Sequence, residues 1–170
     1  MIKVIARFIN ALNGNVKKSQ LAAGFAWGLL LALIPVGNIF WIALFLISFF
    51  FRHNYWAKII FMVVGIILTP LFAPLMDAIG WSVLHIAGLQ PFFTEMYNTP
   101  FVPFTKFNNT LVAGGLVSGV IIWLPAFFAF MGLITVYRKY LAFKLRDTKF
   151  ARVLAKIPLF SSINKAMKKG

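Results

Sequence analysis

The sequence predicts an all-α integral membrane protein, with broken or re-entrant helices and amphipathic interfacial helices at both ends. Its 170 residues are 61% hydrophobic and 12% charged, and the mean hydropathy is +0.88, a composition typical of membrane proteins. No charged residue occurs between Lys18 and Arg52. As one helix this stretch would be about 50 Å long, whereas the hydrocarbon core of a bilayer is about 30 Å thick. This stretch is therefore too long to be one simple span. Together with the apolar segments that follow it, it predicts one membrane domain, residues 19–137.

The basic residues are concentrated at the two ends of the chain. The formal net charge is +14, and of the 17 Lys and Arg residues only Arg52, Lys58 and Lys106 lie between the terminal segments. Basic segments beside apolar runs stay on the cytoplasmic side and attract anionic lipid headgroups. This pattern predicts that both termini are cytoplasmic and that membrane lipids, rather than nucleic acid, are the partners.

The first 18 residues are predicted to form an interfacial helix. Ile2, Ile5, Phe8, Ile9 and Leu12 recur at helical spacing, with basic residues on other faces. We expect this helix to lie on the cytoplasmic leaflet.

Residues 19–51 are predicted to form a re-entrant hairpin. Pro35 removes a backbone donor, and Gly37 and Asn38 tolerate turn conformations, so the break divides the run into two arms of about 21 Å each. Turn backbone inside a bilayer must be covered by protein or line a water-filled cavity. Because a chain of 19.1 kDa has little mass for this, we expect it to assemble with itself or with a large envelope protein. In the first arm, Gly24 and Gly28 form a G-x-x-x-G pattern that allows another helix to approach closely.

A polar connector with Arg52 and Asn54 leads to a second apolar segment, residues 59–89, which we expect to be broken at Thr69-Pro70 and again at Pro74. Asp77 lies within this segment, and a carboxylate in an apolar run indicates transport, protonation or contact with polar lipid groups. The alternative is that Asp77 lies at the membrane interface or pairs with Arg52 or His85.

Residues 90–110 are rich in Pro, Phe, Asn and Thr and are predicted to form an irregular extracytoplasmic loop, followed by an apolar segment at 111–137.

Cytoplasmic termini require an even number of crossings, so one of the three apolar regions must enter and leave on the same side. We assign that role to 19–51. A rival scheme folds the second region at residues 69–74.

The basic tail, 138–170, is predicted to contain an amphipathic helix at 150–157.

Several motifs resemble a bacterial family of small inner-membrane proteins, the domain of unknown function 2062. They are G-F-A-W-G at 24–28, P-V-G at 35–37, R-H-N at 52–54 and T-P-L at 69–71, followed by Pro74 and Gly80. Thr69 stands where the family usually has Asn before the Pro. The chain layout also resembles a subfamily encoded beside a large envelope protein, which we expect to be of the AsmA-like lipid-transfer kind. The resemblance implies a bacterial inner-membrane location.

Two functions follow as hypotheses. The first is a non-enzymatic inner-membrane partner of a periplasmic lipid-transfer protein, whose re-entrant helices perturb or open the bilayer. The alternative is an autonomous transporter or channel for a small solute or polyprenyl-linked lipid. We expect no catalytic, cofactor or metal site, because the sequence has no carboxylate pair, phosphate loop or clustered ligands. The candidate functional or structural residues are Gly24, Gly28, Pro35, Gly37, Asn38, Arg52, Asn54, Thr69, Pro70, Asp77 and Gly80.

Overall fold

The structure is a computed structural model that describes residues 11–12 and 16–141. Within these ranges the chain is helical and contains no β-strand, which confirms the predicted all-α class. Its α-helices are α2 (Lys18–Leu33), α3 (Ile39–Ile47), α4 (Tyr55–Leu84), α5 (Gln90–Asn98) and α6 (Thr110–Val136). Shorter helical segments are η1 (Ser48–Phe50), η2 (Ala87–Leu89), η3 (Val102–Thr105) and η4 (Tyr137–Leu141).

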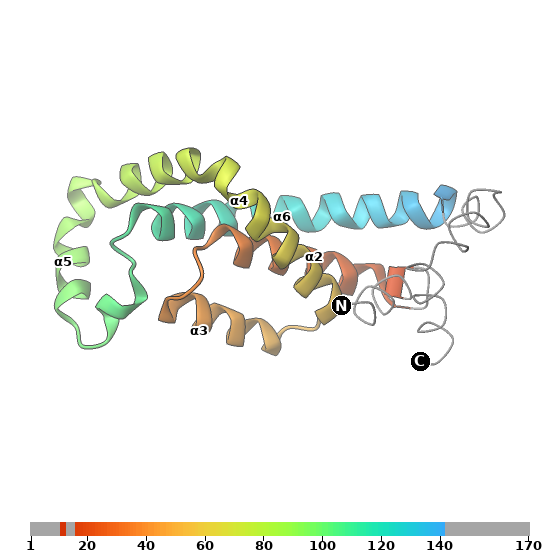
Figure 1. Cartoon of the computed structure of the whole chain (residues 1–170), viewed down its shortest axis with the longest axis horizontal. Coiled ribbons are helices and arrows are strands. Elements are labelled where there is room, and N and C mark those ends of the chain that lie inside the picture. The colour runs from red at the N-terminus through yellow and green to blue at the C-terminus, as the bar shows by residue number, and fades with distance from the viewer. Residues whose placement is uncertain (1–10, 13–15, 142–170) are drawn as a thin grey trace.

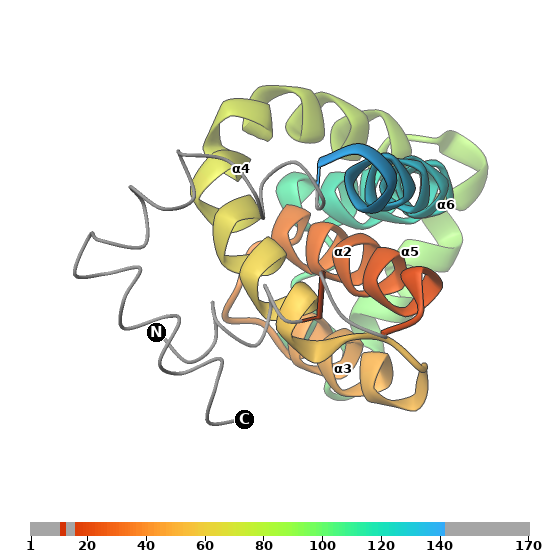
Figure 2. The ribbon, with the colours of Figure 1, turned by 90° about the vertical axis from the view of Figure 1, so that its right-hand side faces the viewer.

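Helices α2, α4 and α6 form a bundle that holds most of the buried core (Figures 1 and 2). Gly28 of α2 lies against Lys58 near the start of α4, and Ala32 lies against Gly65 further along both helices, so α2 and α4 run parallel. Helix α6 runs antiparallel to both (Figure 1). We call the end at which α2 begins and α6 ends the proximal end, and the other the distal end.

The first apolar region is broken where the sequence predicts. Helix α2 ends at Leu33 and α3 begins at Ile39, and α3 returns beside α2 as the second arm of a hairpin (Figures 1 and 2). Phe40, Trp41 and Phe45 of α3 pack against the buried cluster that includes Leu31 of α2. The side chains on the opposite face of α3 are exposed.

The predicted breaks in the second apolar region are wrong. Helix α4 is continuous from Tyr55 to Leu84, with Pro70 and Pro74 inside it, and it curves over α2 and α6 (Figures 1 and 2). A proline removes only one helical hydrogen bond. Packing against neighbouring helices keeps such a helix continuous, although it bends. The continuity of α4 also removes the rival scheme in which this region folds back at 69–74.

Residues 90–110 are more regular than predicted. Pro91 lies in the first turn of α5, where its missing N–H costs nothing, and Phe93 and Met96 face inward at i and i+3 spacing. Segment η3 follows, flanked by Phe101 and Lys106 with left-handed backbone angles, φ 68° and 54°. This part of the chain is therefore a helical cap over the distal end.

Two helices, Tyr55–Leu84 and Thr110–Tyr140, are long and apolar enough to cross a membrane. The first described residues and the end of α6 lie together at the proximal end. There Lys18 Nζ donates to Thr135 Oγ1 at 3.4 Å, and the Arg138 guanidinium donates to the carbonyl oxygens of Ala11, Leu12 and Val16 at 2.8–3.1 Å. The amphipathic helices predicted in 1–18 and 138–170 lie largely outside the described residues.

Candidate functional site

Gly24 and Gly28 lie where α2 meets α4. A Cβ at Gly24 would be 2.5 Å from the carbonyl oxygen of Asn54, and one at Gly28 would be 2.6 Å from that of Lys58. Gly80 of α4 makes a still closer approach to α6, at the carbonyl of Thr110. These three positions have no room for a side chain, so their place in the fold is to bring helix backbones together.

The break between α2 and α3 is satisfied by side chains. The carbonyl oxygens at the end of α2 have no helical partner. Trp41 Nε1 donates to the Leu31 oxygen at 2.8 Å, and Thr69 Oγ1 donates to the Ala32 oxygen at 2.8 Å. Asn38 Nδ2 donates to the Pro35 oxygen at 2.7 Å, while Asn38 Oδ1 accepts from the backbone N–H of Trp41 at 2.7 Å. Side chains of the protein thus satisfy the carbonyl oxygens of Leu31, Ala32 and Pro35 at the hairpin tip.

The positions of Gly37 and Pro70 are explained by backbone conformation. Gly37 has a φ of +90° in the turn, a conformation that favours glycine, and nothing lies within 4 Å of a Cβ built there. Pro70 follows Thr69 within the bend of α4, so it does not end the helix as predicted.

The connector before α4 combines a helix cap with two buried basic groups. Asn54 Oδ1 accepts from the Ala57 N–H at 2.9 Å and caps α4, while Arg52 is exposed. Lys58 is 1% exposed, and its Nζ donates to Ser48 Oγ at 2.8 Å. The ammonium also lies over the rings of two phenylalanines and a tyrosine, Phe45 at 4.5 Å, Phe49 at 3.9 Å and Tyr55 at 5.5 Å. The hydrogen bond and cation–π contacts of Lys58 thus hold the end of the hairpin against α4.

His53 is the second buried basic group in the connector. Its Nδ1 bonds with the Phe51 carbonyl oxygen at 2.8 Å, its ring contacts Tyr55, and its buried Nε2 has no hydrogen-bond partner among the described residues. Burial, together with the positive charge of Lys58, lowers the pKa of His53 below its usual value of 6.5. The carbonyl of Phe51 opposes this shift in pKa.

Asp77 is exposed on α4 and accepts a hydrogen bond from the hydroxyl of Thr110 at the start of α6. The uncharged stretch of α4 between Lys58 and Asp77 is about 27 Å long, close to the thickness of a hydrocarbon core. Arg52 precedes α4 at its opposite end, so the structure does not bring it to Asp77. Asp77 instead ties α4 to α6 near the distal end.

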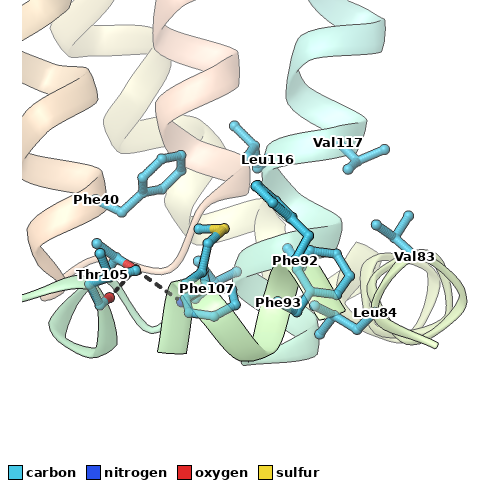
Figure 3. A pocket seen from close by; sticks show the side chains of 13 residues that line it. Phe40, Val83, Leu84, Phe92, Phe93, Thr105, Phe107, Leu116 and Val117 are labelled. Atoms are coloured by element: carbon cyan, nitrogen blue, oxygen red, sulfur yellow. Dashed lines mark hydrogen bonds between the residues drawn. The ribbon is translucent and has the colours of Figure 1, made fainter. Parts of the chain in front are cut away.

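A cavity of about 430 Å³ lies beside Asp77's end of the bundle, beneath the cap formed by α5 and η3 (Figure 3). We call it the apolar cavity. Its lining side chains come from α3, α4, α5, η3, the turn after η3, and α6, and they are apolar except for Thr105: Phe40, Val83, Leu84, Phe92, Phe93, Met96, Val102, Thr105, Phe107, Val112, Ala113, Leu116 and Val117. Thr105 Oγ1 donates to the Val102 carbonyl at 2.6 Å and accepts from the Phe107 N–H at 3.3 Å, so its polar atom is occupied.

A second cavity of about 310 Å³ adjoins the first, and we call it the polar cavity. The two share three lining residues, Leu84, Phe93 and Phe107. The remaining lining residues of the polar cavity are His85, Gln90, Thr94, Tyr97, Asn108 and Thr110. An apolar chamber of this size beside a group of hydrogen-bonding side chains fits a ligand with an apolar part and a polar end.

Sequence reasoning missed these cavities. The lining residues of the apolar cavity come from segments up to 77 positions apart, between Phe40 and Val117, and nearly all are ordinary apolar residues in their own segments. The polar residues of the second cavity are likewise separated along the chain. The one available signal was the density of Phe in residues 90–110, where Phe93 and Phe107 contribute to both cavities.

Comparison with known proteins gives a relative over nearly the whole chain. No family model matches, so the resemblance to the domain of unknown function 2062 rests on its motifs, and no solved structure matches. The chain is 32% identical over 159 residues to a protein of Treponema pallidum (strain Nichols) described as "Uncharacterized protein", and the match covers 94% of this chain and 98% of that protein. The chain therefore belongs to the same family as this Treponema pallidum protein.

Proposed function

We propose that this chain is a lipid-handling component of a bacterial inner membrane, acting with a periplasmic partner. The apolar cavity is the observation that carries the proposal, because it lies against the two helices long enough to cross a membrane and offers about 430 Å³ of almost purely apolar space. A soluble polar substrate would lose its hydration there without gaining hydrogen bonds. A lipid acyl chain has no hydrogen-bonding groups, so it does not incur this loss of hydration when it enters the cavity.

The hairpin gives such a lipid a route. We propose that α2 and α3 enter and leave the bilayer from the cytoplasmic side, with the tip reaching toward the cavity. Helix α2 has 16 residues, about 24 Å of helix, which is shorter than the hydrocarbon core. Phe40, at the start of α3, lines the cavity. A short apolar wall of this kind thins the adjacent bilayer and eases the movement of lipid toward the tip.

The cap supplies the surface for the partner. Phe92, Tyr97, Phe101 and Phe104 are exposed around α5 and η3, and Phe101 is 78% exposed. Exposed aromatic side chains of this kind anchor protein interfaces as well as membrane boundaries. We propose that this end faces the periplasm and there meets a large envelope protein of the lipid-transfer kind.

In-cell photo-crosslinking tests this function. A photoreactive residue at Phe104 is placed at the cap, and a control at Tyr140 is placed at the proximal end, where that side chain is also exposed. The proposal predicts one large periplasmic protein crosslinked through position 104 and not 140, and lipid retained when the complex is purified in native nanodiscs. A lipid-free protein with no crosslink at 104 would contradict it.

The same preparation also tests the autonomous transporter. That function predicts a defined oligomer of this chain alone, with solute flux in liposomes that falls in an Asp77→Asn variant. Flux that Asp77→Asn leaves undiminished would remove Asp77 from any such mechanism.

A further inference from the structure

We infer that the two adjoining cavities form one site for a lipid with a neutral, hydroxyl-bearing headgroup, such as a diacylglycerol or a glycosyl-diacylglycerol. An acyl chain occupies the apolar cavity and the headgroup occupies the polar cavity. This inference rests on the proposed function and adds the class of ligand.

The apolar cavity accepts only an apolar group. Its single polar side chain, Thr105, already donates and accepts within η3 and the following turn. Figure 3 shows Phe40, Leu116 and Phe92 reaching the cavity from three different helices, so the walls are apolar on all of these sides. A ligand atom with an unsatisfied donor or acceptor would be penalised at every position in this space.

The polar cavity offers neutral donors and acceptors. Tyr97 and Asn108 line it, and neither side chain makes a hydrogen bond to any part of the chain that the structure describes. Gln90 donates through its Nε2 to the Leu84 carbonyl, which leaves its Oε1 as an acceptor. His85 bonds through Nδ1 to the Trp81 carbonyl at 2.8 Å, which leaves Nε2 available. A phenol, amides and an imidazole suit hydroxyl groups, which both donate and accept.

The charges around the site disfavour an anionic headgroup. No Lys or Arg among the described residues lines either cavity. The charged side chains near this end are Asp77, bonded to Thr110, Glu95 on α5 and Lys106 after η3, and none of the three lines either cavity. A phosphate entering the polar cavity would lose hydration without a cationic side chain in the described lining to replace it. A neutral headgroup does not incur this penalty.

The two cavities adjoin, which lets one lipid extend across both. Leu84, Phe93 and Phe107 belong to both linings, so the two cavities meet at these three side chains. Trp81 stacks on His85 with ring centroids 4.3 Å apart and is 57% exposed at the edge of this region. An aromatic platform of this kind favours the apolar face of a sugar ring.

A competition assay with the full-length protein in nanodiscs tests the inference. The probe is a fluorescent diacylglycerol, and the competitors are unlabelled diacylglycerol, glycosyl-diacylglycerol, phosphatidylethanolamine and phosphatidylglycerol with the same acyl chains. Three variants are compared with the natural protein. Ala113→Phe fills the apolar cavity, Asn108→Leu removes a polar group from the headgroup site, and Ala78→Phe places the same large ring on an exposed face of α4 as a control.

The inference predicts that the neutral lipids displace the probe at concentrations at least about tenfold lower than phosphatidylglycerol does. Ala113→Phe weakens probe binding by about tenfold or more, and Ala78→Phe leaves it unchanged. Asn108→Leu reduces the difference between neutral and anionic lipids while the protein still binds the probe.

Two other results separate the inference from the proposed function. Equal or better competition by phosphatidylglycerol or phosphatidylethanolamine, with Ala113→Phe still harmful, would overturn the headgroup class and leave lipid binding in place. Absence of probe binding, or binding that Ala113→Phe and Ala78→Phe affect alike, would overturn both. Thermal unfolding of each variant shows whether a lost affinity reflects a lost fold.

Discussion

Thr69 links the two helices whose packing supports the hairpin tip. Its hydroxyl donates to the carbonyl oxygens of Ala32 and Gly65, both at 2.8 Å. Thr69→Val keeps the shape and removes the donor, which leaves the Ala32 carbonyl unsatisfied away from water. We expect the free energy of unfolding to fall by about 1 kcal/mol or more. Thr69→Ser keeps the hydroxyl and serves as the control. Equal stability of the Val and Ser variants in detergent unfolding would show that this bond contributes nothing.

His53 makes the stability of the connector depend on pH. Because burial and Lys58 lower the pKa of His53 in the folded protein, the unfolded chain binds more protons as the pH falls below about 6.5. The folded state therefore loses stability from pH 6.5 downward and gains nothing from this group above it. We expect the melting temperature to fall between pH 7.5 and 5.5, and His53→Gln to reduce that fall. A profile that His53→Gln leaves unchanged would assign the pH dependence to other groups.

At the level of residues, the sequence located the hairpin tip but not how it is satisfied. Pro35, Gly37 and Asn38 mark a turn by their own backbone preferences, and the break lies there. Trp41 and Thr69 supply donors to the end of α2, and nothing in their local sequence indicates this. Thr69 was assigned to a break because it precedes Pro70, whereas the structure uses its hydroxyl within a continuous helix.

Helix packing depends on glycines that have no room for a side chain. Gly80 and Gly114 face each other across α4 and α6, and a Cβ on either one would overlap a backbone carbonyl, that of Thr110 or Met76 respectively. Gly80→Ala or Gly114→Ala must separate the helices, and we expect a loss of about 1–3 kcal/mol in unfolding free energy.

Gly132 supplies the matched control for this seam. It also lies within α6, but nothing is within 4 Å of a Cβ built there. Gly132→Ala should be neutral or slightly stabilising, since alanine favours helix. Similar melting temperatures for the Gly114 and Gly132 variants would mean that the close approach of α4 and α6 does not hold in the membrane.

Element boundaries were predicted well where backbone chemistry decides them and poorly where packing does. The end of α2 and the start of α6 lie within a few residues of the expected positions. The second apolar region was expected to break at its prolines, but tertiary packing keeps α4 intact. The Pro and Asn content of residues 90–110 predicts an irregular loop, yet Pro91 fits the first turn of α5, and the half-buried Phe93 and Met96 line the cavity beneath it.

The whole molecule offers a direct test of topology, because the sequence contains no cysteine. Single cysteines that replace Arg52 and Glu95 report on which side of the membrane the connector and the cap lie. Both positions are exposed. A re-entrant α2–α3 hairpin predicts that Arg52→Cys reacts with an impermeant maleimide only after the cytoplasmic side is opened, and that Glu95→Cys reacts from outside. Labelling of Arg52→Cys from outside would mean that α2 and α3 do not return to the side they entered.

Photo-crosslinking with a lipid shows whether a lipid occupies the apolar cavity. A diacylglycerol carrying a photoreactive group within one acyl chain is incorporated into membranes with the full-length protein, and the modified peptides are mapped by mass spectrometry. If a lipid occupies the cavity, adducts form on cavity residues such as Met96 and Leu116, and they are lost in Ala113→Phe and retained in Ala78→Phe. Adducts confined to outward-facing residues such as Ile67 and Ile121, with the same yield in both variants, would contradict it.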